Sequence, residues 1–488
     1  MDYLFKPGYG PEWGSGGVFG LTYYRKVLYY TISMEGEAHF QHDNEETVYR
    51  FELLGPGPSS GGDTYNAVET VDEYIYFGGW VHNPAVYKLR EGFAGEIDFR
   101  YKYSHVHEYN INEKTVKLVW SETARSEREW AGEVSEIVYD WLNDKLLLAR
   151  ADGHFNLGIF ELDRSSSELK RLSDIPGLKG SLFLEFACFD MRPDWRRGVD
   201  GVQCYDPHEK RMLYYSVRDW AAASVDGEGV ENRGSGYAVS AYARYWHFFR
   251  GGLLVGNPVE PDVEEPLFVR LFDFPGTQYS PSRSNALVIG GGVLAAFNAY
   301  SHGVLHVAEP KKSLVKTLNY TVGPSVLVYI TPPVARIVLA TGARITSMTK
   351  RGNDVLLGTN NSPNLGGRDA TKVDIGVREV LSVSEESILT GRQPPVVFRV
   401  EGSTVGSRVF GGVPLTGYKE PHLRVFSSKP NTLKVSEYDV GLPPRLVDTS
   451  SYSISEGWNR VDLSSHDNIV SFKLMNPDEK AVVYIVLE

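Results

Sequence analysis

The stretch IVYDWLNDKLLLARADGHFNLGIFELD, residues 137–163, contains the pattern that predicts the fold. Two apolar runs, 137–139 and 145–151, flank the polar turn Leu142-Asn143-Asp144, and further runs follow at 158–163 and 168–172. Short apolar runs separated by Gly, Asn and Asp are typical of β-strands joined by tight turns. The stretch therefore predicts consecutive antiparallel strands that form one four-stranded unit.

The same unit recurs along the chain. Clear copies begin at residues 68 and 286, and weaker copies fall within 18–54, 182–217, 237–274 and 345–400. Seven copies at a spacing of roughly 40 to 60 residues are expected of four-stranded propeller blades. Closing the blades into a ring also protects their strand edges. We therefore predict an all-β protein with a seven-bladed β-propeller over residues 1–404.

The pattern changes after about residue 405. Apolar runs at 423–426, 433–438, 469–474 and 482–486 alternate with turns such as Lys429-Pro430-Asn431. This pattern predicts a small C-terminal antiparallel β-sandwich or jelly-roll-like module over residues 405–488. In an alternative arrangement, part of this segment supplies a closing strand to the first blade.

Composition excludes several classes of protein. The 488 residues carry 50 Lys and Arg against 62 Asp and Glu, a net charge of −12, which disfavours nucleic-acid binding. The N-terminus lacks the layout of a signal peptide, and the longest apolar stretches, 286–297 and 325–340, are too short or too interrupted for a membrane span. We therefore expect a cytoplasmic protein that contacts no membrane.

The few sulfur-containing residues are also informative. Scarce Gln, 6 Met and 2 Cys are typical of a hyperthermophile. Cys188 and Cys204 lack the spacing of a metal site, but in a hyperthermophile they could form an intracellular disulfide. Whether they pair is left open by the sequence.

Four segments resemble a family of uncharacterised archaeal proteins. They are YFGGWVHNPA at 76–85, SHVHEYN at 104–110, YDWLNDKLLLARADGHFNLG at 139–158 and EGWNRVDLSSHDNIVSFKL at 456–474. The resemblance runs along the whole chain and implies an archaeal origin and a propeller-like fold. It implies no activity and supplies no catalytic residue.

Common enzyme motifs are missing from the sequence. Phosphate-binding GxxxxGK[ST], GxGxxG, HExxH and EF-hand patterns do not occur, nor do Trp-Asp repeat signatures. One GxSxG pattern, at residues 57–61, lies between GPGP and GGDT rather than between a strand and a helix. We interpret it as a loop, so any chemistry must come from residues that the fold brings together.

Aligning the second strands of the repeats places His82, His154 and His302 at the same position. In a propeller, the ends of second strands and the starts of first strands surround the axis on one face. We therefore predict a polar axial face, with His105 as a further candidate for it. Its predicted residues are Asn66, His82, Glu136, Asp152, His154, Glu185, Asn285, Asn298, His302 and Asn360.

These residues allow a catalytic or a ligand-binding site. His82, His154, His302, Glu136 and Glu185 are the candidates for acid–base catalysis, and the three histidines could bind a divalent metal. Asn66, Asp152, Asn285, Asn298, Asn360 and Arg368 are the ligand-binding candidates, with Arg368 suited to an anion. Alternatively, these side chains only tie loops and turns to the backbone. The pair His105 and His107 shares one strand face, and we favour a packing role for it.

Three functions remain open at this point. The first is a propeller that binds or processes a small ligand or carbohydrate, as a hydrolase or lyase, and the abundant Trp and Tyr suit sugar stacking. The second is a non-catalytic scaffold for protein partners, and the third is a structural subunit of a homo-oligomer. A site predicts polar side chains gathered in one pocket, whereas a scaffold predicts a broad exposed apolar area.

Overall fold

The coordinates are a computed structural model of the 488-residue chain. The residues that the structure describes are 17–32, 37–51, 61–63, 66–82, 87–88, 96–97, 102–123, 132–151, 157–194, 197–234, 236–277, 279–281, 283–299, 322–360 and 378–488.

Seven antiparallel sheets follow one another from β1 to β30, and consecutive strands pair in hairpins in most of them. The first sheet contains β1 (Val18–Tyr24), β2 (Val27–Ile32), β3 (Glu37–His42) and β4 (Glu45–Arg50). The second contains β5 (Gly61–Asp63), β6 (Val68–Val71), β7 (Tyr74–His82), β10 (Lys102–Asn110) and β11 (Thr115–Thr123). The third contains β12 (Glu133–Asp140), β13 (Lys145–Ala151), β14 (Gly158–Asp163) and β15 (Leu169–Ser173). A separate pair, β8 (Tyr87–Lys88) and β9 (Glu96–Ile97), lies between β7 and β10 in the sequence.

The next four sheets repeat this plan. The fourth contains β16 (Gly180–Phe183), β17 (Phe186–Met191), β18 (Gly201–Asp206) and β19 (Arg211–Ser216), and the fifth contains β20 (Tyr237–Ala241), β21 (Arg244–Phe249), β22 (Gly252–Gly256) and β23 (Leu267–Arg270). The sixth contains β24 (Ala286–Ile289), β25 (Gly292–Phe297), β26 (Ser325–Thr331) and β27 (Val334–Thr341). The seventh contains β28 (Arg344–Arg351), β29 (Asp354–Asn360) and β30 (Arg378–Ser384). The short helix α2 (Glu385–Thr390) follows β30.

Tight turns with left-handed backbone join the first two strands of several sheets. Arg25 and Lys26 have φ of 46° and 68°, and Gly290 and Gly291 have φ of 51° and 78°. Positive φ at both central residues is the requirement of a type I′ hairpin turn, whose twist matches that of the flanking strands. The polar and Gly-rich turns seen in the sequence are therefore the reason that the repeat forms hairpins.

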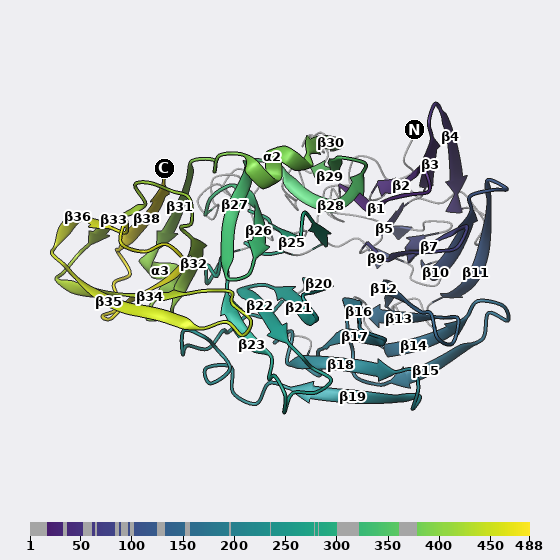
Figure 1. Ribbon diagram of the computed structural model, residues 1–488, viewed down its shortest axis with the longest axis horizontal. Coiled ribbons are helices and arrows are strands. Elements are labelled where there is room, and N and C mark those ends of the chain that lie inside the picture. Colours follow the sequence, from purple (N-terminus) through teal and green to yellow (C-terminus); the bar gives the residue numbers. More distant parts are fainter. Residues whose placement is uncertain are drawn as a thin grey trace.

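The seven sheets are arranged in a propeller-like ring, with their first strands innermost (Figure 1). Each innermost strand contacts the next, from β6 through β12, β16, β20 and β24 to β28, and β28 contacts β1. Side chains secure this last contact: the Thr346 hydroxyl donates to the Val18 carbonyl at 2.7 Å, and the Tyr23 N–H donates to Thr349 Oγ1 at 3.0 Å. The ring thus closes between residues more than 300 positions apart.

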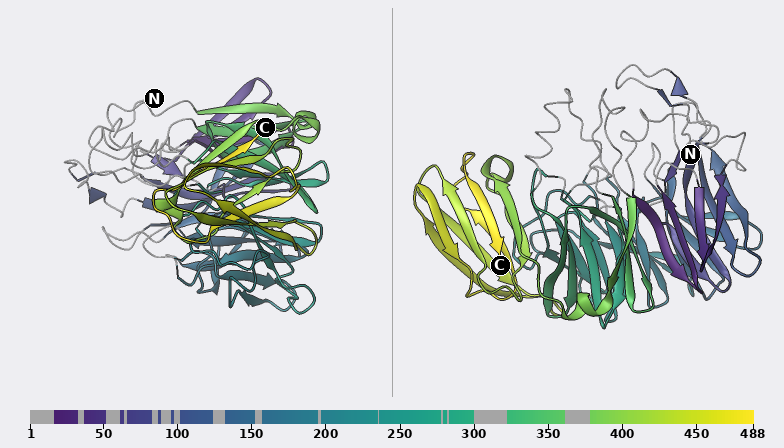
Figure 2. Two further views of the ribbon diagram at one scale, coloured as in Figure 1. Left: turned by 90° about the vertical axis from the view of Figure 1, so that its left-hand side faces the viewer. Right: turned by 90° about the horizontal axis from the view of Figure 1, so that it is seen from above.

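Two further four-stranded sheets form the C-terminal part of the chain. One has the order β31-β38-β33-β36 and the other β32-β37-β34-β35, and both lie at one flank of the ring (Figures 1 and 2). Their strands are β31 (Val396–Glu401), β32 (Phe410–Pro414), β33 (His422–Ser427), β34 (Asn431–Tyr438), β35 (Leu446–Ile454), β36 (Gly457–Asp462), β37 (Ile469–Leu474) and β38 (Val482–Leu487), and α3 (Gly402–Val405) connects β31 to β32.

Strand β31 differs from the sequence expectation, which assigned this stretch to the last repeat unit. It pairs with β38 of the C-terminal sheets, so these sheets begin before residue 405. The alternation that buries Val396, Phe398 and Val400 suits any half-buried strand and does not indicate its partner. Within the described residues, none of the strands β31 to β38 pairs with the first sheet, as the closing-strand alternative required.

The C-terminal sheets share an apolar core with the ring. Phe398 of β31 packs against Phe272 and Phe274, which follow β23, with ring centroids 5.7 and 5.3 Å apart. The same cluster of buried side chains continues from Trp246 of β21 to Ile485 of β38. The C-terminal sheets are therefore joined to the fifth and sixth sheets by apolar packing as well as by the chain.

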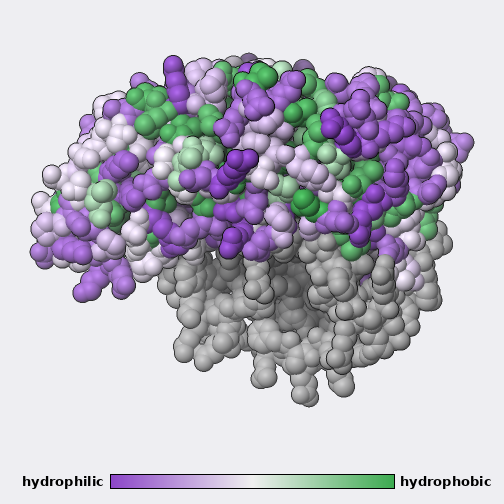
Figure 3. Space-filling model, turned by 90° about the horizontal axis from the view of Figure 1, so that it is seen from below, coloured by the Kyte–Doolittle hydropathy of each residue, from purple (hydrophilic) through white to green (hydrophobic). Residues whose placement is uncertain are grey.

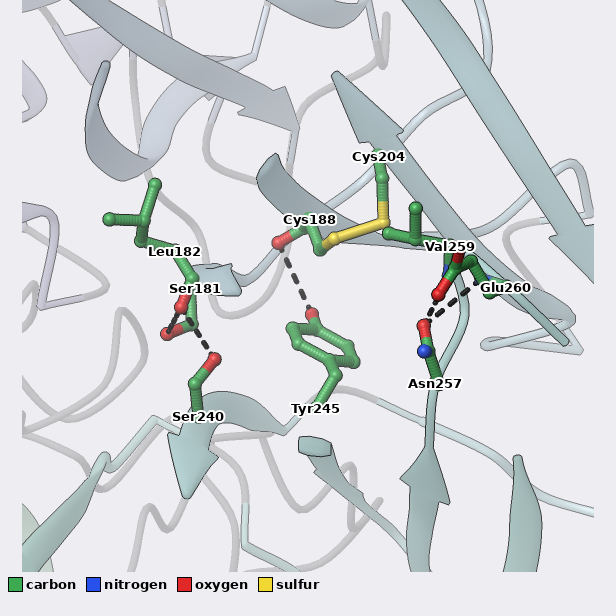
Figure 4. The surroundings of a disulfide bond; sticks show 9 residues. All are labelled: Ser181, Leu182, Cys188, Cys204, Ser240, Tyr245, Asn257, Val259 and Glu260. Atoms are coloured by element: carbon green, nitrogen blue, oxygen red, sulfur yellow. Dashed lines mark hydrogen bonds between the residues drawn. A yellow bond between two sulfur atoms is a disulfide. The ribbon is translucent and has the colours of Figure 1, made fainter. Parts of the chain in front are cut away.

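A disulfide links the second and third strands of the fourth sheet (Figure 4). Cys188 of β17 and Cys204 of β18 are direct cross-strand neighbours, and both are buried. The Tyr245 hydroxyl on the neighbouring sheet donates to the Cys188 carbonyl oxygen at 3.3 Å. The pairing that the sequence left open is thus present in the structure.

Candidate functional site

The structure describes only part of the predicted axial face. Asn66, Glu136, Asn285, Asn298 and Asn360 lie on the innermost or second strands of the ring or beside them. His82 ends β7, where only its backbone is described. Asp152, His154, His302 and Arg368 lie outside the described residues. The predicted arrangement of three histidines therefore remains a prediction.

Asn66 connects three parts of the ring. It precedes β6 with a φ of 60°, a conformation that Asn tolerates better than most residues. Its Oδ1 accepts from the Gly20 N–H at 2.7 Å, and its Nδ2 donates to the carbonyl oxygens of Thr346 at 3.0 Å and Ser284 at 3.3 Å. Both polar atoms of the amide are thus engaged in holding the first, second, sixth and seventh sheets together.

Asn285 and Asn298 act in a similar way between the sixth and seventh sheets. The Asn285 amide donates to the Met348 carbonyl at 2.8 Å and accepts from the Met348 N–H at 2.7 Å. The Asn298 amide makes the same pair of bonds with Ile345, each at 2.8 Å. Such two-point contacts satisfy backbone groups of β28 on the side where no described strand pairs with it. Asn360, at the end of β29, is fully buried.

Glu136 lies at a bulge in β12, where the register with β13 shifts between Val134 and Glu136. Its Oε2 is 3.0 Å from the Lys179 ammonium, which also donates to the Ser135 carbonyl at 2.8 Å. Burial raises the pKa of Glu136, and the Lys179 charge opposes that rise. Lys179 is almost fully buried, so the two charges depend on each other for stability.

Glu185 corrects one prediction. The sequence placed it in the innermost strand of its sheet, pointing into the axis. The structure instead places it after Leu184, which has a φ of 55°, in the turn between β16 and β17. Its side chain is 40% exposed, with a distant contact to His208 at 3.9 Å. This turn joins the first strand to the second, so it lies at the opposite edge of the sheet from the predicted face.

Glu69 of β6 was not among the predicted residues. Its Oε1 accepts from the Thr70 N–H at 2.9 Å, and its Oε2 accepts from the Tyr139 N–H of β12 at 3.3 Å. Burial raises the pKa of Glu69 to about 7, with a further contribution from the negative charge of Glu136. A Glu within the apolar run VETV resembles the signal that singled out Glu185, but counting back from the aligned second strands pointed to Asn66 in this repeat.

A second group that was missed lies between the fourth and fifth sheets. Asp190 of β17 accepts from the N–H groups of Leu178 and Lys179 at 2.7 and 2.8 Å, and its other oxygen is 3.8 Å from Arg192. His247 of β21 is fully buried, and neither ring nitrogen has a hydrogen-bond partner among the described residues. Burial lowers the pKa of His247 to about 4; the Asp190 charge opposes this fall, and the Arg192 charge adds to it.

Together these residues form what we call the inter-sheet polar row. It consists of Glu69, Glu136, Lys179, Asp190, Arg192 and His247. Each member is joined to the next by an ion pair, a hydrogen bond or an electrostatic effect on its pKa, from the second sheet to the fifth. A carboxylic acid with a raised pKa beside a carboxylate held by Lys179 is an arrangement suited to acid–base chemistry.

His105 and His107 are packed within the second sheet. Their Nδ1 atoms are 3.1 Å apart, and both rings contact Phe51, at centroid distances of 4.8 and 5.2 Å. Burial lowers the pKa of His105 to about 3 and that of His107 well below its ordinary value. These contacts agree with the packing role favoured by the sequence.

Metal binding and membrane insertion find no support in the described residues. No group of three or more His, Cys, Asp or Glu side chains in this part of the chain is placed to hold a metal ion. No described helix has the length and apolar character needed to cross a membrane.

The described outer surface mixes polar and apolar residues. In the view of Figure 3, hydrophobic residues form small areas between hydrophilic ones. The most exposed large apolar side chains that the structure describes, Trp141, Leu184, Val263 and Trp458, come from four different sheets or their loops. On the side drawn in Figure 3, the described hydrophobic residues are thus interspersed with hydrophilic ones.

Comparison with protein families gives one match. The model described as "Uncharacterized protein conserved in archaea (DUF2139)" matches residues 28–368. No curated protein matches the chain.

Solved structures match at low similarity. The extracellular domain of a hybrid two-component system from B. thetaiotaomicron is 11% identical with a TM-score of 0.40, and the match covers 75% of this chain and 38% of that one. An arabinoxylan arabinofuranohydrolase of glycoside hydrolase family 43 from Bacillus subtilis is 10% identical with a TM-score of 0.30, covering 86% and 94%. An oligogalacturonate lyase in complex with manganese is 9% identical with a TM-score of 0.31, covering 56% and 70%.

Proposed function

The chain belongs to the DUF2139 family of proteins conserved in archaea, and we propose that this member is a seven-bladed β-propeller that cleaves a C–O bond in a small carbohydrate. In this proposal the blades are the seven sheets from β1 to β30, and the C-terminal sheets form an accessory β-sandwich. The closed series of contacts between innermost strands supports the count of blades. The pairing of β31 with β38 supports a boundary just before residue 396.

The proposed chemistry rests on Glu69 and Glu136. Glu69, with a pKa raised to about 7, donates a proton to the leaving oxygen as the C–O bond breaks. Glu136, held by the Lys179 ammonium at 3.0 Å, takes a proton either from an attacking water or from a carbon next to the leaving group. The first route is hydrolysis and the second is elimination, and each leaves one proton on the departing oxygen.

A single observation carries this proposal. Two partly exposed carboxyl groups on the adjacent innermost strands β6 and β12 lie close enough that the charge of one raises the pKa of the other. Burial raises the pKa of both groups, but among the described residues only Glu136 has a lysine partner, whose charge opposes the rise. Two neighbouring carboxyl groups in different electrostatic surroundings are a combination from which a general acid and a general base can be built.

The remaining predicted residues complete the proposal as ligand contacts. His82, His154, His302, Asp152 and Arg368 are proposed to line the axial face beyond the two carboxyl groups, in the cytoplasm of the cell. If the three histidines hold a divalent metal, elemental analysis of untagged protein will find it bound stoichiometrically. A double variant, His82→Ala with His154→Ala, is then expected to lose the metal.

The direct test is a screen of oligosaccharides for new reducing ends and for unsaturated products, which distinguish hydrolysis from elimination. On a substrate so found, Glu69→Gln and Glu136→Gln are each expected to lower kcat by about 100-fold or more. Glu209→Gln, on the exposed turn between β18 and β19, is the matched control. Unchanged rates in both carboxyl variants would refute the assignment.

A further inference from the structure

A pocket separate from the inter-sheet polar row lies where the ring meets the C-terminal sheets. Its volume is 550 Å³, and its walls come from the segment between β19 and β20, the turn between β21 and β22, the segment after β23 and the segment before β32. This volume is in the range of small-molecule sites, which often lie between structural units. We call it the junction pocket.

Most charged side chains that line the junction pocket are engaged elsewhere. Glu231 pairs with Arg408 at 2.7 Å, and Glu228 pairs with Lys473 at 2.8 Å. Asp273 pairs with Arg270, and Asp219 accepts the Ala221 N–H at 2.9 Å. These contacts leave one charged group of the pocket to account for.

That group is Arg250, in the turn between β21 and β22. Its guanidinium makes no hydrogen bond or ion pair with a described residue, although burial and the nearby Asp273 both act on its pKa. The Arg250 side chain is half-buried and lines the pocket, so its five donor N–H groups need not leave a protein partner before they bind a ligand. A bound anion would supply the missing acceptors.

Trp220 supplies a second unused donor. Its indole N–H is buried and has no acceptor among the described residues. Its ring is held in place by the Arg233 guanidinium, 4.7 Å from the ring centroid, and by edge contacts with Phe249 and Phe268 at 5.5 and 5.7 Å. The Trp220 ring is therefore a fixed part of the pocket wall, while its N–H has almost no surface open to solvent.

From these groups we infer that the junction pocket binds a small hydroxylated monocarboxylate, such as an acidic sugar. Arg250 takes the carboxylate through its planar fork, and the ring of Trp220 forms a wall for the body of the ligand. The lining carboxylates accept hydrogen bonds from ligand hydroxyl groups, which an apolar ligand would leave desolvated. A phosphate dianion fits less well, since only one cationic side chain of the pocket is unpaired.

The experiment uses the full chain and isothermal titration with three probes: D-glucuronate, D-glucose and inorganic phosphate. Binding of glucuronate at least about tenfold more tightly than glucose is expected, and Arg250→Met is expected to remove that preference. Trp220→Phe is expected to weaken glucuronate binding severalfold. Arg408→Met is the matched control, because Arg408 lines the same pocket but is already paired with Glu231.

Melting temperatures separate binding from folding. Arg250→Met removes a charge that makes no hydrogen bond or ion pair with a described residue, so this variant is expected to melt at or above the temperature of the unsubstituted protein. Trp220→Phe removes part of a ring packed against Arg233, Phe249 and Phe268 and is expected to melt at a lower temperature. Equal affinity for glucuronate and glucose, equal losses in Arg250→Met and Arg408→Met, or tighter binding of phosphate than of glucuronate would each overturn the inference. All three outcomes are independent of catalysis at Glu69 and Glu136.

Discussion

Replacing Glu69 by Gln is expected to remove a loss of stability that the unsubstituted protein suffers as pH rises. The pKa of Glu69 is raised from 4.5 to about 7 in the folded chain, mainly by burial. Unfolding returns the carboxyl group to water, where it releases its proton near pH 4.5. The folded state is therefore favoured below pH 4.5, and this advantage disappears as pH rises through about 7.

The size of the effect follows from the two pKa values. A span from 4.5 to about 7, at about 1.4 kcal/mol for each pKa unit, corresponds to about 3 kcal/mol of unfolding free energy. Gln keeps the shape of the side chain and can still accept the Tyr139 N–H, but it does not titrate. Relative to Glu69→Gln, the unsubstituted protein should thus lose about 3 kcal/mol between pH 4 and pH 8.

Urea unfolding followed by tryptophan fluorescence, repeated at several pH values in this range, measures the difference. Glu209→Gln removes an exposed carboxyl group from a turn and should show no comparable change. Glu136 is present in both proteins, so its own titration largely cancels. A constant difference across the range, or a relative gain of stability by the unsubstituted protein at high pH, would refute the reasoning.

Three further predictions concern the ring. Lys179→Met should lower the unfolding free energy at pH 8 by about 3–5 kcal/mol because it leaves Glu136 buried without its partner; urea unfolding should show recovery when Glu136→Gln is added, and equal stability of the single and double variants would contradict this. Asn298→Ala should lower the unfolding free energy by about 2–5 kcal/mol, since the N–H and the carbonyl of Ile345 both lose a buried partner. A fall in melting temperature too small to measure would argue against a stabilising role for these two hydrogen bonds. As pH falls from 6.5 towards 4, the unfolding free energy of the unsubstituted protein should decrease relative to that of His247→Phe by up to about 3 kcal/mol, because the pKa of His247 in the folded chain lies near 4. This pH dependence is opposite in sign to that of Glu69. Parallel stability curves of the two proteins across this pH range would contradict the prediction.

Much of the strand pattern could be predicted because polar turns are local signals. The apolar run at 145–151 coincides with β13, and the turn that precedes it is where the sequence placed it. The partner of β31 could not be predicted, since burial of every second residue is the same in any sheet. Local periodicity thus identifies strands but does not say which strands pair at a distance.

The candidate site, too, could be predicted only in part from local sequence signals. Glu136 was found by counting back from the second strands of the aligned repeats, and it lies on an innermost strand; Glu185, chosen because it interrupts an apolar run, lies in a turn instead. Asn285 and Asn298 were predicted on the axial face, but their amides bond the backbone of β28. His247 gave no signal, because in the aromatic run RYWHFF it looks like an ordinary buried residue.

Ring closure between β1 and β28 also has a consequence in time. The contact from Thr346 to Val18 spans 328 residues, so β1 is synthesised long before β28, the strand that it contacts. At a ribosomal rate of about 5–20 residues per second, the delay is about 16–66 s. Throughout that interval the inner edge of the first sheet is unprotected in the nascent chain, and a strand from another chain could pair with it. The first strand is therefore at risk of pairing with another chain until the seventh sheet has been synthesised.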